Sequence, residues 1–326
     1  MKPFHLTTIA WVLLVAALIA GAQSASAQQY PIRPIRMVVP FAPGGTADLA
    51  ARIISGPLRG LLGQSIVVDN RPGAGAVVGA DIVAKSRPDG YTLLYATPGP
   101  QITNPYLMKS LPYDAMHDFA SVAELLIAPN VLAVHPGIPA KSVRELIDFA
   151  KTQPGKLNFS SSGIGASSHL SAELFKTMAG IQINHVPYKG TAPAMVGLIA
   201  GNVQMSLDSI GPLLPHIQSG ALRALGVTSL ERSPLLPEVP AVAETLPGFD
   251  AAAFNYIAVR AGTPRPIVAR LNKEINTVLR MPEVRERFYG LAVTTQIGTP
   301  ESLDARIKRE AEKWKKVIEF SGAKAE

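Results

Sequence analysis

The chain has 326 residues, a formal net charge of +7 at pH 7, 47% hydrophobic residues and no cysteine. The missing cysteine excludes disulfides, thiolate metal sites and a lipid-modified N-terminal cysteine. The basic excess is spread along the chain without a long block of one sign, which argues against a nucleic-acid-binding protein, whereas a mildly basic protein suits anionic ligands.

The N-terminus has the features of a secretory signal peptide. Lys2 precedes an apolar run over residues 9–22, and Ala25-Ser26-Ala27 offers an Ala-x-Ala cleavage site before Gln28. The apolar run is too short to span a bilayer, and no later segment reaches the roughly 20 apolar residues that a transmembrane helix needs. We therefore expect a signal peptide over residues 1–27 and a soluble mature protein outside the cytoplasm.

A Pro43-Gly44-Gly45 turn lies between a short apolar strand, predicted over residues 36–39, and the start of a helix. Glycines let a backbone approach a ligand closely, and the first free amides of a helix point outward at the positive end of its dipole. The turn therefore predicts an anion-binding loop. From this segment alone, an ordinary strand-to-helix connection is an equal alternative.

Beyond the signal peptide, short β-rich runs alternate with longer helical patterns, which predicts an α/β fold. A capping box at Ser142 to Glu145 opens a helix that reaches about Thr152, and Thr263 and Thr299, each before a proline, are predicted helix caps. The predicted strands cover residues 36–39, 66–68, 92–95, 131–134, 157–159, 204–207, 224–227 and 256–259.

Two regions have the features of domain boundaries. An apolar segment ends at Ala128-Pro129-Asn130, and residues 233–249 contain four prolines. If the chain crosses into a second lobe at the first region and returns at the second, a cleft separates the lobes. We expect residues 28–128 in lobe 1, residues 129–251 in lobe 2, and residues 252–326 back in lobe 1 with the C-terminal helices.

A second loop rich in glycine and serine covers residues 160–169, between a predicted strand and a helix expected at about residues 167–178. Its glycines open the backbone and its hydroxyls add donors, so a carboxylate could bind here without a charged partner. Ser168 beside His169 also suggests a serine hydrolase. That alternative is weaker, because adjacent helical residues point to different faces and no Gly-x-Ser-x-Gly elbow occurs.

The run Gly73 to Gly79 approaches a dinucleotide-binding fingerprint but has three residues, not two, between its second and third glycines. It is interpreted as a turn that leads into a helix packed on the cleft wall, and we expect no cofactor. The histidines lack the spacing of metal ligands, so we expect no metal site. The mixed charges of residues 306–316 are interpreted as a solvated helix face.

Thr97 and Asp208 lie at the ends of two predicted strands. Ligands collect at the carboxyl ends of parallel strands, so both side chains are expected to face the cleft. For Asp208, capping of the segment after Ser209 is an equal alternative.

These motifs together resemble the substrate-binding receptors of tripartite tricarboxylate transporters, the Bug/TctC family of periplasmic binding proteins. The resemblance is nearly full length and runs through YPIRPIRMVVPFAPGGTADLAAR, VVDNRPGAG, RPDGYTLL, NPYLMKSLPYD, PGKLNFSSSGIGASSHLSAELF, HVPYKGTAPA, LPHIQSGALRALGVTS and RSPLLPEVP. It implies a two-lobed type II periplasmic binding protein fold, with a sheet flanked by helices in each lobe. The lobes would close on a small carboxylated solute.

The resemblance also implies that residues 41–48 and 161–169 each grip a carboxylate, largely through backbone amides and ordered water. It implies a monomer whose partner is a membrane transporter, or a sensor protein if the receptor is a signalling adaptor. Gly75-Ala76, Gly197 and Leu207 depart from the family pattern, which leaves the solute open. The expected ligand-binding residues are Phe41, Pro43, Gly44, Gly45, Thr46, Asp48, Thr97, Ser162, Gly163, Gly165, Ala166, Ser167, Ser168, His169 and Asp208.

Overall fold

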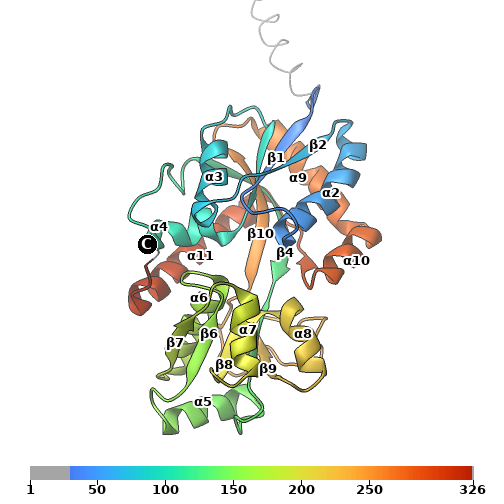
Figure 1. The fold of residues 1–326 in the computed structure, drawn as a ribbon. Coiled ribbons are helices and arrows are strands. Elements are labelled where there is room, and N and C mark those ends of the chain that lie inside the picture. The colour runs from blue at the N-terminus through green and yellow to red at the C-terminus, as the bar shows by residue number, and fades with distance from the viewer. Residues whose placement is uncertain (1–29, 325–326) are drawn as a thin grey trace, which may run out of the picture.

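The structure is a computed structural model that describes residues 30–324, so the signal peptide expected over residues 1–27 lies outside the described part. Two mixed sheets with helices packed on them form two lobes, one above the other in the view of Figure 1. This architecture confirms the predicted two-lobed α/β fold. None of the described helices is both long and apolar enough to cross a membrane.

The sheet of the upper lobe in Figure 1 has six strands in the order β11-β4-β10-β3-β1-β2. Strand β1 is parallel to β2 and β3, whereas β10 is antiparallel to β3 and β4. The carboxyl ends of β1 and β3 therefore lie at the same edge of the sheet. The strands are β1 (Ile35–Val39), β2 (Ile66–Asn70), β3 (Thr92–Ala96), β4 (Phe119–Ala128), β10 (Ala253–Arg260) and β11 (Thr294–Thr295).

The sheet of the lower lobe has five strands in the order β7-β6-β8-β5-β9. Strand β6 is parallel to β7 and β8, and β5 is antiparallel to β8 and β9. The strands are β5 (Asn130–Val134), β6 (Asn158–Ser161), β7 (Asn184–Pro187), β8 (Met205–Ser209) and β9 (Arg223–Val227).

Helices cover both sheets. Those of the upper lobe are α2 (Thr46–Leu62), α3 (Val77–Ala84), α4 (Asn104–Leu107), α9 (Arg265–Arg280), α10 (Pro282–Gly290) and α11 (Pro300–Ser321). Those of the lower lobe are α5 (Val143–Thr152), α6 (Ser167–Ala179), α7 (Thr191–Ile199) and α8 (Ile210–Gln218). Short helical turns cover Ala74–Ala76, Gly99–Thr103 and Val242–Glu244.

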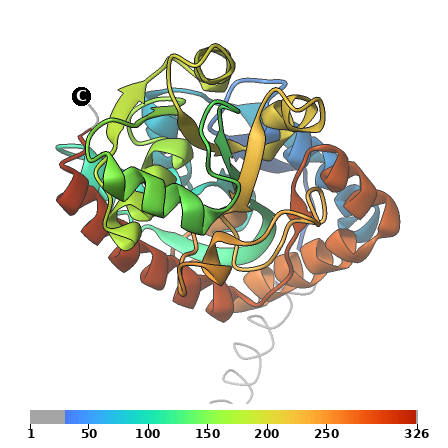
Figure 2. The same ribbon diagram turned by 90° about the horizontal axis from the view of Figure 1, so that it is seen from below.

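The two sheets are joined by β4 and β10. One residue, Pro129, separates the end of β4 from the beginning of β5, and β10 receives the chain on its return from the lower lobe. Helix α11 contacts both β4 of the upper lobe and α6 of the lower lobe. Figure 2 shows the C-terminal helices, coloured orange to red, along one long side of the molecule. The last helix is therefore placed where it contacts both lobes.

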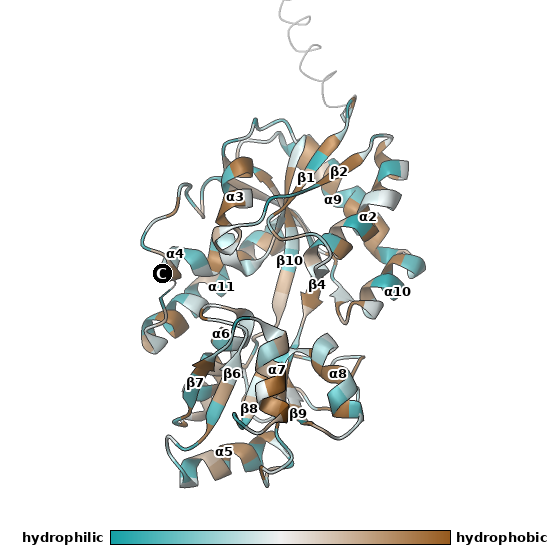
Figure 3. Ribbon diagram, viewed as in Figure 1, coloured by the Kyte–Doolittle hydropathy of each residue, from teal (hydrophilic) through white to brown (hydrophobic). Residues whose placement is uncertain are grey.

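Apolar side chains are buried at helical spacing. The banding of α2 in Figure 3 reflects its amphipathic sequence, with residues such as Ile54 and Leu58 buried against the sheet. One core cluster extends from Leu94 and Phe254 at the upper sheet to Phe159 and Phe175 in the lower lobe. Full burial of such side chains contributes about 1.5–3 kcal/mol each.

All eight predicted strands are present, with bounds that differ by up to a few residues. Ser142 and Thr299 cap their helices as predicted, each accepting a hydrogen bond from a backbone amide three residues later. The prediction for Thr263 was wrong by one residue. Pro264 is the residue that precedes α9, and the Thr263 hydroxyl donates to the carbonyl of Arg260, 2.7 Å away.

Candidate ligand-binding cleft

A cleft with walls from both lobes contains two chambers, which share Phe41, Thr97 and Asn255 as wall residues. The α11 chamber has a volume of about 480 Å³ and is lined by α4, the loop before α6, the start of β10 and two residues of α11. The α2 chamber has a volume of about 570 Å³ and is lined by the beginnings of α2, α7 and α8 and by residues 291–293. Both volumes are in the range of small-molecule sites.

The first glycine loop, residues 40–45, connects β1 to α2. Gly44 has a φ of +84°, and its amide donates to Asp48 Oδ2, 2.9 Å away. Arg52 Nε also donates to this carboxylate, and the hydrogen bond from Arg52 lowers the pKa of Asp48. Gly45 and Thr46 line the α2 chamber, where the unpaired amides of the first turn of α2 begin.

The second glycine loop, residues 162–166, connects β6 to α6. Gly165 has a φ of +78°, and its amide donates to His169 Nδ1, 3.1 Å away. The amide of Ser162 donates to Ser168 Oγ at 2.9 Å. The loop therefore uses its own amides to hold its shape, and the first-turn amides of α6, from Ser167 onward, are the donors left for an anion in the α11 chamber.

Each loop contains a hydrogen bond of the same kind. In it, the amide of a glycine in the left-handed region donates to a side chain four residues later. We call this bond a clasp. Gly44 and Asp48 form the first clasp, and Gly165 and His169 form the second. Only glycine adopts this backbone conformation without strain, so both loops need glycine at the clasp.

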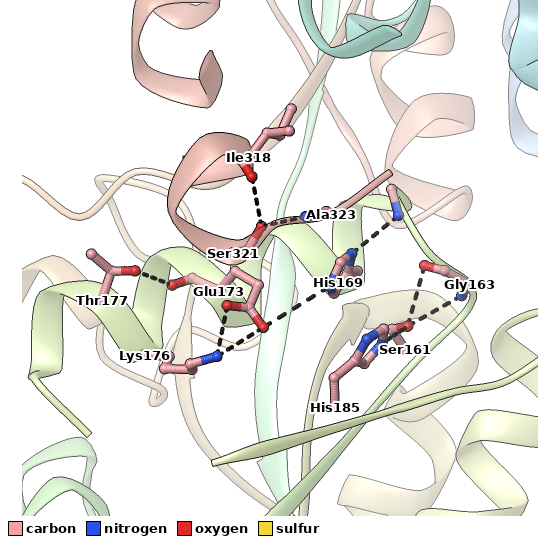
Figure 4. A network of polar contacts seen from close by, with 11 residues as sticks. Ser161, Gly163, His169, Glu173, Lys176, Thr177, His185, Ile318, Ser321 and Ala323 are labelled. Carbon is pink, nitrogen blue, oxygen red and sulfur yellow. Dashed lines mark hydrogen bonds and ion pairs between the residues drawn. The ribbon is translucent and has the colours of Figure 1, made fainter. Parts of the chain in front are cut away.

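Behind the second clasp lies the buried network of Figure 4. The rings of His169 and His185 stack with centroids 4.0 Å apart, and Ser161 Oγ lies 2.6 Å from His185 Nε2. Glu173 lies on the other side of His169, with Oε1 at 3.9 Å from Nε2, and forms an ion pair with Lys176.

Burial lowers the pKa of His169 to about 4, with smaller contributions from His185 and Lys176, and burial with Lys176 lowers the pKa of His185 to about 4. Both rings are therefore neutral at neutral pH, which leaves Nδ1 of His169 free to accept the Gly165 amide. Ser168 Oγ is hydrogen-bonded to Ser162 and His169 Nδ1 to Gly165, so these two side chains are not arranged as a nucleophile and its base.

The run Gly73 to Gly79 forms the turn into α3 that was predicted. Gly75 lines the α11 chamber, and a Cβ atom on Gly79 would lie 2.7 Å from Pro40 Cβ, so only glycine allows this approach. Ala74 and Ala76 have positive φ values of 45° and 76°, a strained conformation for alanine. The turn therefore stores strain beside the chamber.

Thr97 follows β3 and lines both chambers, as expected. Asp208 lies within β8 and is buried, and it does not line either chamber. Its Oδ1 accepts from the amide of Ser209 and from the hydroxyl of Thr191, and burial raises the pKa of Asp208. These bonds hold the beginnings of α7 and α8 together, which agrees with the capping alternative.

The expected site residues fall into two groups. The residues that line a chamber are Phe41, Gly45, Thr46, Thr97, Ser162, Gly163, Gly165, Ala166 and Ser167. The residues that do not line either chamber are Pro43, Gly44, Asp48, Ser168, His169 and Asp208. Three members of the second group, Asp48, Ser168 and His169, accept hydrogen bonds from amides of the loops. The sequence patterns missed the wall residues Asn104, Leu107, Met108, Asn255, Glu310 and Trp314.

The interpretation of residues 306–316 as a solvated helix face was wrong for one side of α11. Glu310 is 3% exposed and Trp314 6% exposed, and both line the α11 chamber. Arg306 forms an ion pair with Glu124 of β4 and lies over the ring of Phe254. Charged residues usually indicate an exposed helix face. Here Arg306 and Glu310 are tolerated on the buried side because each forms an ion pair.

The chain is similar to known proteins over nearly its whole length, and two of the similar solved structures hold a small carboxylate. BugT of Bordetella pertussis is 39% identical over 326 residues and covers 99% of each chain. Rpa4515 of R. palustris, solved with adipate, is 36% identical with a TM-score of 0.75, over 90% of this chain and 99% of that one. MatC of Rhodopseudomonas palustris, solved with malate, is 32% identical with a TM-score of 0.71, over 89% and 100%. The family model described as "Tripartite tricarboxylate transporter family receptor" matches residues 50–323, and the chain therefore belongs to this receptor family.

Proposed function

We propose that this protein is a periplasmic receptor that binds a small di- or tricarboxylate, or a related carboxylated metabolite, between its lobes. The observation that carries the proposal is the pair of clasped glycine loops, one in each lobe, which lead into helix N-termini at the two chambers of one cleft. The adipate and malate held by two relatives support a carboxylate as the ligand.

In the proposed mechanism, one carboxylate binds the first-turn amides of α2 and another binds those of α6. The solute thereby joins residues 28–128 and 252–326 to residues 129–251 and stabilises the closed form. A ligand that touches one lobe alone has little differential affinity for the closed form and cannot shift the population. The binding residues are proposed to be those expected from the sequence, with Gly44, Asp48, Ser168, His169 and Asp208 acting through the loops and helix starts.

The partner in this proposal is a tripartite tricarboxylate-type membrane transporter, which recognises the closed form of a monomeric receptor. The solute is released unchanged, because the role is binding and delivery rather than catalysis. Export through the signal peptide would leave a mature N-terminus at Gln28. The intact mass of the exported protein tests that cleavage site, and retention of Met1 in a membrane fraction would contradict it.

A melting screen with mono-, di- and tricarboxylates, combined with small-angle scattering, tests the proposal. A dicarboxylate at about 100 times its dissociation constant should stabilise the fold by roughly 2.7 kcal/mol, which raises the melting temperature by a few degrees. The radius of gyration should fall with the same ligand. Strong stabilisation with an unchanged scattering profile would show that binding is confined to one lobe.

A further inference from the structure

The walls of the α11 chamber are mainly hydrocarbon. Leu107 and Met108 come from the upper lobe, Leu170 from the lower lobe, and Trp314 from α11. Among the described residues that line this chamber there is no Lys, Arg or His. A solute body in this chamber therefore lies against alkyl and aromatic side chains, and its charge is left to the backbone amides at the start of α6 and at the first glycine loop.

Several polar side chains on these walls already have partners inside the protein. Asn104 Nδ2 donates to the carbonyl of Gly75 at 2.9 Å, and Asn255 Nδ2 donates to the hydroxyl of Tyr95 at 2.9 Å. Ser171 Oγ donates to the carbonyl of Ala251 at 3.3 Å. A hydroxyl group on a solute body that lies against the apolar walls would thus lose its hydrogen bonds to water, and these walls offer no replacement.

Glu310 gives the α11 side of the chamber a negative group. Its Oε2 accepts from Lys313 Nζ at 2.6 Å and from Trp314 Nε1 at 3.0 Å, so the carboxylate is held in place and its charge is balanced. A carboxylate of the solute against this wall would lie near Glu310 and have no unpaired cation beside it, because Lys313 is already paired with Glu310. The negative ends of the solute therefore belong at the glycine loops, and its uncharged part belongs against Trp314.

We infer that the solute is a carboxylate with an unsubstituted hydrocarbon body, an alkyl chain or an aromatic ring, rather than a hydroxy acid or a sugar acid. This inference rests on the proposed function, because it assumes that the carboxylates bind at the two loops. An unpaired hydroxyl in an apolar site typically costs about a factor of ten in affinity. A solute with several hydroxyls is excluded more strongly.

The fluorescence of Trp314 provides a direct readout of this chamber. The chain has two tryptophans, Trp11 and Trp314, and a protein that begins at Gln28 retains only Trp314. Two pairs of probes differ only in hydroxyl groups: adipate against the six-carbon diacid with hydroxyls on its four inner carbons, and succinate against malate. Benzene-1,4-dicarboxylate tests the aromatic form of the class.

We expect adipate or the aromatic diacid to bind at least about tenfold more tightly than the tetrahydroxylated diacid, and succinate to bind more tightly than malate. Met108→Gln places an amide of similar length in the chamber and should reduce the preference for adipate severalfold. Met116→Gln is the matched control, because Met116 is exposed and does not line the chamber. Circular dichroism establishes that both variants are folded.

Each result has a separate meaning. Tight and saturable binding of the hydroxylated acids, equal to or better than that of their hydrocarbon counterparts, would overturn the inference and leave the receptor function intact. If the native protein binds none of the carboxylates, the proposed function itself fails. An unchanged preference in Met108→Gln would remove the α11 chamber as the place where the body of the solute binds.

Discussion

The two glycine loops have the same backbone design and different side-chain chemistry. Each follows a parallel strand, contains a glycine with a φ near +80° and bonds that glycine's amide to a side chain in the first turn of the next helix. In the first clasp the acceptor is the carboxylate of Asp48, paired with the half-exposed Arg52. In the second it is the neutral ring of His169, buried against His185.

The two loops thus differ only in the side chain that supports the glycine amide, and not in the backbone amides offered to an anion. In the proposed function, the donors to the solute are amides of a helix start in both lobes. The side-chain support of these amides is ionic and half-exposed in the first loop and uncharged and buried in the second. The first clasp should therefore respond to salt, and the second should respond to pH. Variants at matched positions of the two loops test this comparison.

The largest effect is expected from a charge placed at the first loop. Gly45 has a φ of −78°, and a Cβ atom there would lie 3.8 Å from its nearest neighbour, so substitution leaves the fold intact. Gly45→Asp adds a negative group where a carboxylate should bind. Since hydrogen bonds to charged groups contribute roughly 1.5–3 kcal/mol each, loss of two lowers the affinity about a hundredfold or more.

Calorimetry with the best carboxylate measures this loss. Gly45→Ala is the matched control and should bind within a few fold of the native protein, because it adds only an uncharged methyl group at ordinary van der Waals distance from Ala42. An unchanged affinity in the folded Gly45→Asp variant would remove the first loop from the binding site.

The next prediction compares the ligand affinities of alanine variants at the two clasp glycines, Gly44 and Gly165. A Cβ atom on Gly44 would meet nothing within 4 Å, whereas one on Gly165 would lie 2.9 Å from Leu107 Cδ1, across the cleft. Both alanine substitutions add backbone strain of about 1–2 kcal/mol. Gly165→Ala also obstructs the approach of the lobes, and we expect its affinity to fall about 10- to 100-fold, against less than about tenfold for Gly44→Ala.

The double variant Gly165→Ala with Leu107→Ala separates strain from obstruction. It removes the side chain that the new methyl group would meet, so part of the lost affinity should return. If the affinities of Gly165→Ala and Gly44→Ala fall equally, contact between the lobes at Leu107 is not what distinguishes the two loops.

The sequence predicted both loops because their information is local. A glycine turn between a strand and a helix start is visible within ten residues, and so are the family motifs that contain Gly44 and Gly165. The sequence analysis did not distinguish the residues that line a chamber from those that form the clasps. The spacing of four residues from Gly44 to Asp48 and from Gly165 to His169 is nevertheless visible in the sequence. A spacing alone does not tell whether a side chain turns back to the loop or toward a ligand.

The remaining wall of the site could not be predicted, because distant segments form it. Trp314 lies more than a hundred residues beyond Gly165, and Leu107 reaches the second loop only because the two lobes approach each other. The alternating charges of α11 also conceal its buried side. Arg306 is paired with Glu124 of β4, a partner that is absent from the local sequence.

An effect on stability rather than on affinity should appear in acid. The pKa of His169 and that of His185 are each lowered from 6.5 to about 4 in the folded protein. Between pH 6.5 and 4, therefore, the two rings are protonated in the unfolded chain and neutral in the folded protein. Stability is therefore lost as the pH falls from 6.5 to 4, by up to about 3 kcal/mol for each ring. Glu173 and Lys176, which face the pair, oppose each other in charge.

Urea unfolding between pH 7 and 4 measures this loss. His169→Asn retains an acceptor near the position of Nδ1 but does not titrate, so its stability should depend less on pH than that of the native protein. His117→Gln is the control. The His117 ring is 82% exposed and pairs with the exposed carboxylate of Asp114, so this variant should change the native profile little. The same pH dependence in His169→Asn as in the native protein would contradict the role given to the second clasp.

The smallest effect concerns salt and the first clasp. Asp48→Asn keeps an oxygen that can accept the Gly44 amide but removes the charge that pairs with Arg52. Because the Arg52 side chain is 51% exposed, the ion pair should contribute no more than about 1 kcal/mol. At 1 M salt the screening length falls to about 3 Å, so the difference in unfolding free energy between the native protein and Asp48→Asn should shrink toward zero.

The corresponding difference for His169→Asn at pH 7 should not change with salt, because both partners of the second clasp are neutral. A salt-independent loss in Asp48→Asn would mean that the carboxylate acts as a hydrogen-bond acceptor alone, and the two clasps would then be supported in the same way.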